Sequence, residues 1–225
     1  MDAVTQSPLF GIALSAAAFS AGVWINRRVK LSVANPILIA IPLVILCLLL
    51  TGTPLEHYQR GGEVINMLLS PATVALALSI YRQREILREN FLPVLLGCLA
   101  GCCASVGSTL ALCRLFGLDA ALTASLLPKS VTTPIAVELS RQGGGVAAVT
   151  IVVVLFTGIA GAALAPAMLR LLRITDPVAA GVAIGTASHG IGTARALQLG
   201  KVQGAMSGVA IGVSGIITVL LLTFW

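Results

Sequence analysis

Residues 126–141 read Leu-Leu-Pro-Lys-Ser-Val-Thr-Thr-Pro-Ile-Ala-Val-Glu-Leu-Ser-Arg, a stretch that places a lysine among hydroxyl side chains inside a strongly apolar chain. Pro128 disrupts a continuing helix, because proline has no N–H and its ring crowds the preceding turn. Thr133 followed by Pro134 is typical of an N-cap and the first helical residue. The pattern predicts a half-helix, an unwound stretch at residues 129–132, and a second half-helix that begins at Pro134.

Lys129 is the candidate functional residue of this stretch. A lysine near the centre of a membrane costs about 2.5–3.5 kcal/mol on insertion scales, so its presence calls for a compensating role. We expect it to be the counter-charge of a small anion, whose carboxylate the hydroxyls of Ser130, Thr132 and Thr133 and the N-terminus of the second half-helix would also hold. The alternative is a structural Lys129 that pairs with Glu138 or extends to the membrane interface.

The composition is that of a polytopic membrane protein. Of the 225 residues, 57% are hydrophobic and only 10% are charged, with a mean hydropathy of +1.02, whereas soluble domains carry about 25% charged residues. The net charge of +6 indicates topology and not nucleic-acid binding, because no basic stripe with interleaved aromatic residues is present. No positively charged region precedes the first apolar run, so we expect no cleaved signal peptide.

Neither a metal centre nor a cofactor is expected. The five cysteines lie within or at the ends of apolar segments, where a thiol behaves as a small hydrophobic group. Cys98, Cys102 and Cys103 have no neighbouring histidine or acid that would complete a ligand set. An enzyme is not expected either, because Ser188-His189 lacks an orienting acid and an oxyanion hole, and Thr186 stands where a Gly-x-Ser-x-Gly motif needs glycine.

A membrane-spanning helix needs about 20 apolar residues. The sequence therefore predicts one all-α integral-membrane domain over residues 1–225 with about eight hydrophobic segments, some of them broken by proline or glycine and meeting near the membrane centre. An inverted repeat is one arrangement of such segments. The fifth segment either crosses the membrane or is a re-entrant hairpin, and the lysines and arginines of the loops leave both arrangements open. The segments are residues 3–25, 33–50, 64–80, 91–113, 120–137, 146–169, 177–194 and 202–225.

The seventh segment is interrupted by the small and polar residues 185–193. His189 in this run could line the same cavity as Lys129 and exchange a proton near neutral pH, or it could be a buried neutral histidine bonded to a backbone carbonyl. Because a freed backbone in hydrocarbon must find partners or water, we expect residues 128–134 and 186–193 to face one cavity. Ser188 and His189 would then complete the pocket, with Gly190 contributing to the break.

A second wall of this cavity is predicted from polar residues in the third and seventh segments: Asn66, Ser70, Thr193 and Arg195, with Pro71 breaking the third segment. Arg195 could equally be an ordinary interface residue. Glycines at positions 200, 204, 208 and 212 recur every four residues, which lets another helix approach closely. That close approach occurs either within the fold or in a homo-oligomer.

Residues 127–136 and 185–196 strongly resemble the LrgB/CidB family, as do residues 35–36, 50–52, 70–77 and 173–177. The likeness covers nearly the whole chain, although the family usually has glycine where this chain has Ser70. The resemblance implies a multi-pass protein of the bacterial inner membrane that acts with a small LrgA/CidA-type membrane partner as an antiholin-like regulator of murein hydrolase activity and autolysis. Members are also linked to pyruvate uptake, and the plant plastidial relative to glycolate/glycerate exchange.

Taken together, the residues and the resemblance lead us to expect a transporter of small 2-oxo or 2-hydroxy monocarboxylates, such as pyruvate or glycolate, in the lipid bilayer. The alternative function is an antiholin-like regulatory subunit that works by assembly with its partner. A broken polar segment that encloses a cavity favours transport, whereas a polar face exposed only to a partner favours the regulatory subunit.

Overall fold

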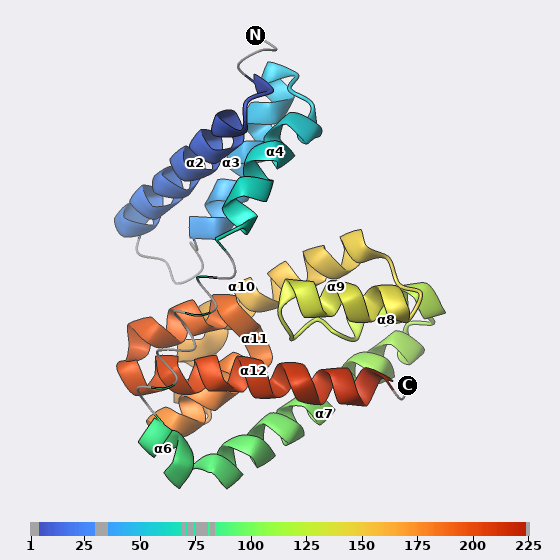
Figure 1. The fold of residues 1–225 in the computed structure, drawn as a ribbon. Coiled ribbons are helices and arrows are strands. Elements are labelled where there is room, and N and C mark those ends of the chain that lie inside the picture. Colours follow the sequence, from blue (N-terminus) through green and yellow to red (C-terminus); the bar gives the residue numbers. More distant parts are fainter. Residues whose placement is uncertain are drawn as a thin grey trace. The chain divides into compact units, whose positions relative to one another are not determined.

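The structure is a computed structural model that describes residues 5–29, 36–68 and 84–223 together with positions 71, 74 and 81. All regular secondary structure in these residues is helical (Figure 1), which confirms the all-α prediction. Within them, four helices are long and apolar enough to cross a bilayer: Pro8–Arg28, Phe91–Leu115, Ala147–Leu171 and Lys201–Thr223. The predicted number of about eight spans is therefore not confirmed. The chain forms two compact units, residues 1–76 and 77–225.

The first unit contains α2 (Pro8–Val29), α3 (Pro36–Thr51) and α4 (Leu55–Asn66), and α2 packs against both of the others. Gly11 of α2 and Gly61 of α4 make the close contact possible, because a Cβ at either position would meet the backbone of the other helix. Of the predicted second cavity wall, Asn66 ends α4 and Pro71 is described only as a helical position. Ser70 lies outside the described residues, so the wall stays a prediction.

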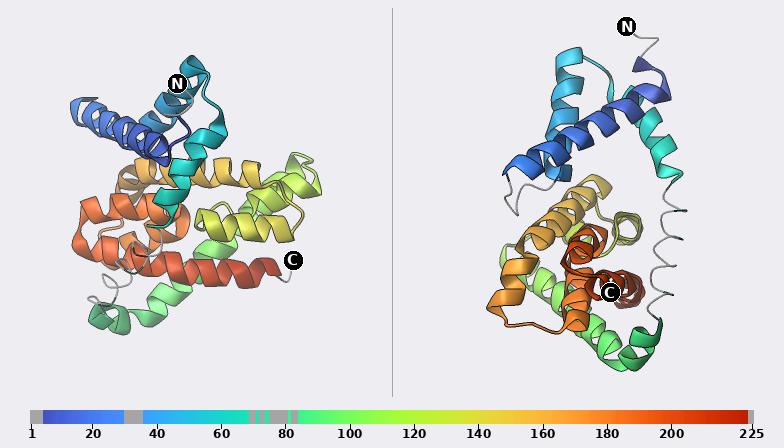
Figure 2. Two further views of the ribbon diagram at one scale, coloured as in Figure 1. Left: turned by 45° about the horizontal axis from the view of Figure 1, so that its top comes forward. Right: turned by 90° about the vertical axis from the view of Figure 1, so that its left-hand side faces the viewer.

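The second unit holds the remaining described helices. They are α6 (Arg84–Glu89), α7 (Phe91–Leu115), α8 (Ala120–Leu126), α9 (Thr133–Gln142), α10 (Ala147–Leu171), α11 (Pro177–Leu199) and α12 (Lys201–Thr223). The core lies between α7, α11 and α12, where Cys98, Val182 and Met206 belong to one buried cluster. A view rotated by 90° shows α12 nearly end-on with α11 beside it (Figure 2, right).

The close packing of α11 on α12 depends on glycines. A Cβ at Gly181 would meet the backbone of Gln203, and a Cβ at Gly185 would meet the backbone of Ser207. The absence of these two side chains lets the backbones approach closely, as small residues do in membrane helix pairs. The first half of α11 is thereby fixed against the first half of α12.

The α8–α9 segment is a helical hairpin. Asp119 caps α8, with its Oδ1 accepting a hydrogen bond from Leu122 N at 2.7 Å, and α8 ends before Pro128 as the sequence predicts. The second helix begins one residue earlier than predicted: Thr132 is the N-cap and Thr133 is the first helical residue. Pro134 fits the second helical position as well as the first, because the N–H groups of the whole first turn have no intrahelical partner.

Buried hydroxyls tie the hairpin to α10. Ser125 Oγ accepts a hydrogen bond from Val146 N at 2.7 Å and donates one to Ala121 O at 2.7 Å. Thr150 Oγ1 donates to Ser140 Oγ at 2.7 Å, and both of these side chains are buried. Because each bond satisfies a polar group away from water, the hairpin is held in one position on α10.

The other break lies within α11, where His189 has φ 40° and ψ −139°. Ile184 and Ala196 pack in the same small core cluster, although twelve residues of straight helix would separate them by about 18 Å. A Cβ at Gly192 would lie 3.0 Å from Ile184 Cγ2. The two halves of α11 are therefore folded back on each other at His189, and α11 is a second helical hairpin.

Candidate functional site

An open cleft of about 680 Å³ lies between α7, α10, α11 and the turn that joins α8 to α9. Its lining is made mainly of small and hydroxyl-bearing side chains from the middle of α7, the middle of α10 and the first half of α11. Lys129 is the one charged side chain among the described residues that line it. The cleft therefore combines a single positive charge with several hydrogen-bonding groups.

Lys129 lies at the tip of the α8–α9 hairpin, where its ammonium group is held by two hydroxyls, one from α7 and one from the next residue in the chain. Its Nζ donates to Ser105 Oγ at 3.0 Å and to Ser130 Oγ at 3.3 Å, and these two oxygens are 2.9 Å apart. An ammonium group has three donors, so one remains for a ligand. The expected alternative partner, Glu138, is exposed and accepts from Gln142 Nε2 at 2.9 Å. The described residues provide no carboxylate partner for Lys129.

Ser188 faces the same cleft from α11. The residue is only 2% exposed, it lines the cleft, and its hydroxyl has no hydrogen-bond partner among the described residues. Gly161 of α10 lies directly opposite, and a Cβ there would collide with Ser188 Oγ. No described side-chain nitrogen or oxygen is both fully buried and unpaired, so the Ser188 hydroxyl is open to the cleft, where it is a candidate ligand contact.

The two interrupted segments thus bring Lys129, Ser130 and Ser188 to one cleft, together with Thr186. Thr132 and Thr133 are not among the lining residues, so the N-terminus of α9 is not part of the cleft. Pro134 and Gly190 are exposed.

His189 also lies outside the lining. It is 4% exposed, and its Nε2 is 3.0 Å from Val154 O of α10. This geometry corresponds to the interpretation of a buried histidine bonded to a backbone carbonyl. A Cβ at Gly158 would meet the imidazole ring, so α10 presents two glycines, Gly158 and Gly161, to the turn of α11.

Thr193 and Arg195 have partners elsewhere. Thr193 Oγ1 donates to His189 O, four residues earlier in the chain, at 3.1 Å and lies 2.7 Å from Ser207 Oγ. Arg195 Nη1 donates to Gln198 Oε1 at 2.7 Å. Neither residue lines the cleft, so the structure does not bring them to Lys129.

Sequence reasoning missed the contribution of α7. Ser105 contacts both Lys129 and Ser130, and Ser108 lines the cleft. The signal was the cluster of polar residues at positions 105–109 in the middle of an otherwise apolar segment, since intramembrane polar groups are costly unless they have partners.

The α11 wall of the cleft is fixed by a buried chain of hydroxyls and thiols. Thr186 Oγ1 donates to Cys98 Sγ at 3.5 Å, and Ser214 Oγ donates to Thr186 Oγ1 at 3.1 Å. Cys102 Sγ in turn donates to Ser214 O at 3.6 Å. These hydrogen bonds join α7, α11 and α12. The two cysteines take part in them as structural residues, as is common for buried thiols.

Comparison with known proteins gives consistent matches. The sequence matches the LrgB-like family over residues 15–225. The antiholin-like protein LrgB of Bacillus subtilis (strain 168) is 35% identical over 219 residues, which cover 97% of this chain and 95% of the relative. The uncharacterized protein YxaC of the same organism is 39% identical over 199 residues, covering 88% of this chain and 86% of the relative.

The antiholin-like protein LrgB of Bacillus mycoides (strain KBAB4) is 34% identical over 221 residues, covering 98% of this chain and 96% of the relative. No solved structure matches the chain. The family match and the nearly full-length relatives agree with the motifs around Lys129 and His189. This chain therefore belongs to the LrgB-like family.

Proposed function

We propose that this chain is an antiholin-like, non-enzymatic protein of the bacterial inner membrane whose Lys129 cleft binds a small monocarboxylate anion. The observation that carries the binding site is a single lysine, held by hydroxyls but with no described carboxylate partner, in a cleft that also exposes the hydroxyl of Ser188. Lys129 is half-buried, and a partly desolvated charge of this kind is stabilised by a counter-ion.

The names of the relatives support the regulatory function better than transport, because two of those described above are called antiholin-like. In this function the chain assembles with a small LrgA/CidA-type membrane protein and controls murein hydrolase activity and autolysis. Anion binding in the cleft would then change the state of the assembly.

The chemistry of the cleft favours a 2-oxo or 2-hydroxy monocarboxylate as its ligand. One lysine balances one carboxylate, whereas the second charge of a dicarboxylate would enter a cleft whose described lining holds no second cation. Ser188 supplies a hydroxyl that can donate to an oxygen on the second carbon of the acid, because a hydroxyl is both a donor and an acceptor. Pyruvate and glycolate fit this description.

Transport is the second candidate function, and the position of the cleft favours it. The cleft lies beside the middle of α7 and α10 and is bordered by two broken helices. Transporters place their substrate sites at such breaks near the bilayer midplane. In this function the anion bound at Lys129 would be released on the other side of the membrane.

The two functions are separated by measuring uptake and murein hydrolase activity with and without the partner. If the chain is a transporter, labelled pyruvate and glycolate accumulate in vesicles that contain it above the level in empty vesicles, and propionate, which lacks the oxygen on the second carbon, competes weakly. Uptake equal to that of empty vesicles would exclude transport. Unchanged murein hydrolase activity in cells that express the chain with its partner would exclude the regulatory function.

His189→Gln is expected to leave the pH dependence of anion binding or uptake between about pH 5 and 8 unchanged, because the imidazole is bonded to Val154 O and does not face the cleft. Glutamine keeps a hydrogen-bonding group of similar reach and cannot titrate. The check is uptake or binding as a function of pH for both proteins. A pH dependence that disappears in the variant would make His189 a proton carrier, as one of the two sequence-based interpretations holds.

A further inference from the structure

We propose that the second unit, residues 77–225, crosses the membrane three times, at α7, α10 and α12, and that α8–α9 and α11 are re-entrant hairpins that enter from opposite faces. This topology does not depend on what the cleft binds. It replaces the arrangement in which every hydrophobic segment of this unit crosses the membrane.

The first hairpin is too short to cross. At about 1.5 Å per residue, α8 extends about 10 Å and α9 about 15 Å, whereas the hydrocarbon core is about 30 Å thick. Near the end of α8, Ser125 bonds to Val146 N at the start of α10, and a Cβ at Gly143 would lie 3.2 Å from Ala124 Cβ. The chain that leaves α7 therefore turns at Lys129 and returns to the face from which it came.

The second hairpin follows from the order of contacts along α12. Before the break, Gly181 faces Gln203 and Gly185 faces Ser207, so this half of α11 runs parallel to α12. After the break the order reverses: Thr193 contacts Ser207, and Leu197 lies against Gly204. The chain that leaves α10 therefore turns at His189 and returns to its starting face before α12 begins.

The long helices have matching directions. Cys98 belongs to the cluster around Met206, and Cys102 further along α7 bonds to Ser214 further along α12, so α7 and α12 are parallel. Figure 1 shows both helices running from the α6 end of the unit towards the end marked C. On α10, Gly161 faces Ser188, whereas the later Ala165 packs with the earlier Ile184. The helix α10 is therefore antiparallel to the first half of α11 and to α12.

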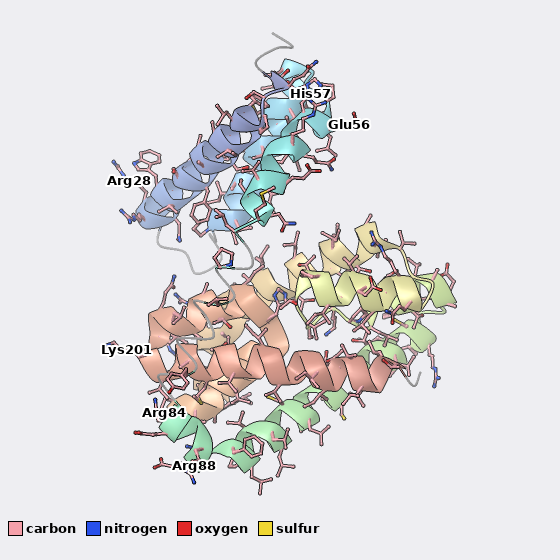
Figure 3. The ribbon with its side chains drawn as sticks, in the orientation of Figure 1. Arg28, Glu56, His57, Arg84, Arg88 and Lys201 are labelled. Atoms are coloured by element: carbon pink, nitrogen blue, oxygen red, sulfur yellow. The ribbon has the colours of Figure 1, made fainter. Side chains whose placement is uncertain are left out.

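The basic residues that the structure describes at the two faces of this unit separate cleanly in this topology. At the face where α7 and α12 begin and α10 ends lie six of them, and Arg84, Arg88 and Lys201 are seen at one end of the unit in Figure 3. At the opposite face lie two, Arg114 and Arg141. Short cytoplasmic loops carry the excess of lysine and arginine, so the richer face is cytoplasmic. The six described basic residues of this face are Arg84, Arg88, Arg170, Arg173, Arg195 and Lys201.

The consequence concerns access to the cleft. The Lys129 turn then reaches it from the outer face, and the Ser188 turn reaches it from the cytoplasmic face. Two hairpins that meet from opposite sides at one site can each open that site to one compartment, as inverted broken helices do in alternating access. Lys129 would then be the binding group on the hairpin that enters from the outer face, and Ser188 the one on the hairpin that enters from the cytoplasmic face.

The test is the accessibility of single cysteines in intact cells to a membrane-impermeant maleimide. The background protein carries serine at Cys47 and Cys103, whereas Cys98, Cys102 and Cys113 are buried and are kept. Four exposed, uncharged positions avoid any change in the charge bias: Leu118→Cys and Gln142→Cys flank the first hairpin, and Leu172→Cys and Gln198→Cys flank the second.

We expect positions 118 and 142 to react in intact cells and positions 172 and 198 to react only after permeabilisation. If every segment crosses, positions 118 and 142 lie on opposite faces, and so do 172 and 198, which would overturn the proposal. Two positions flank each hairpin, and thermal unfolding of each purified variant identifies any that fails to fold. Failure of anion binding would leave this result unaffected, so the topology and the function are tested separately.

Discussion

Lys129→Ala should abolish binding of pyruvate and glycolate while the amount of protein in the membrane stays near that of the wild type. Truncating one partner of a fully buried, hydrogen-bonded charge pair costs about 2–5 kcal/mol. Lys129 is half-buried, so we expect the lower end of this range, and 2 kcal/mol corresponds to about a 30-fold loss of affinity. Insertion should not suffer, because removing a charge from the membrane interior relieves a cost. Binding of labelled pyruvate to membranes that contain each protein, normalised to protein abundance, measures the effect.

Two matched variants serve as controls for Lys129→Ala. Lys201→Ala removes an exposed lysine at the start of α12, and it should leave anion binding unchanged because that side chain does not line the cleft. Lys129→Arg keeps the charge but changes its shape and donor geometry, so it should retain part of the binding. Wild-type affinity of Lys129→Ala for pyruvate and glycolate would make Lys129 a structural residue, and the proposed anion site would be wrong.

Gly161→Ala is expected to destabilise the protein by about 1–3 kcal/mol, as overpacking of a well-packed interior does, and to disturb the cleft. A Cβ at this position would collide with Ser188 Oγ and lie 2.7 Å from Ser188 Cβ. The turn of α11 must therefore move away from α10. The fall in the midpoint of thermal unfolding of the purified protein in detergent checks this prediction.

Gly107→Ala in α7 is the control, because nothing lies within 4 Å of a Cβ at that position. It should be as stable as the wild type or slightly more so, since alanine favours helix over glycine. The double variant Gly161→Ala/Ser188→Gly should regain stability, because Ser188 Cα lies 3.8 Å from the added methyl, but it should not regain anion binding without the hydroxyl. Equal stability of Gly161→Ala and Gly107→Ala would contradict the packing described for the α11 turn.

The helical class and both interruptions could be predicted from the sequence, because they depend on local chemistry. A proline such as Pro128 disfavours a continuing helix whatever the tertiary packing around it. Asp119 and Asp176 cap the helices that follow them, and Asp176 Oδ1 accepts a hydrogen bond from Ala179 N at 2.7 Å. The run of small and polar residues at 185–193 marked the second interruption, and His189 is the residue at which it occurs.

The rest depends on contacts between distant residues. Whether α11 continues or folds back is decided by the packing of Gly192 on Ile184 and by the bond from His189 to Val154, which is 35 residues away. The prediction of about eight segments rests on the length of each apolar stretch. Length alone does not tell a helix that crosses the membrane from a helical hairpin that returns to the same face. The cleft likewise includes Ser105, whose role becomes visible only when α7 lies beside the α8–α9 turn.

Equilibrium binding of labelled pyruvate to the purified protein in detergent tests the central claim, that the Lys129 cleft binds a small monocarboxylate, most directly. The account predicts saturable binding at one site per chain, displaced by unlabelled glycolate and pyruvate, and at least about 30-fold weaker in Lys129→Ala. Absence of saturable binding by the wild type, or equal affinity of the wild type and Lys129→Ala, would contradict it.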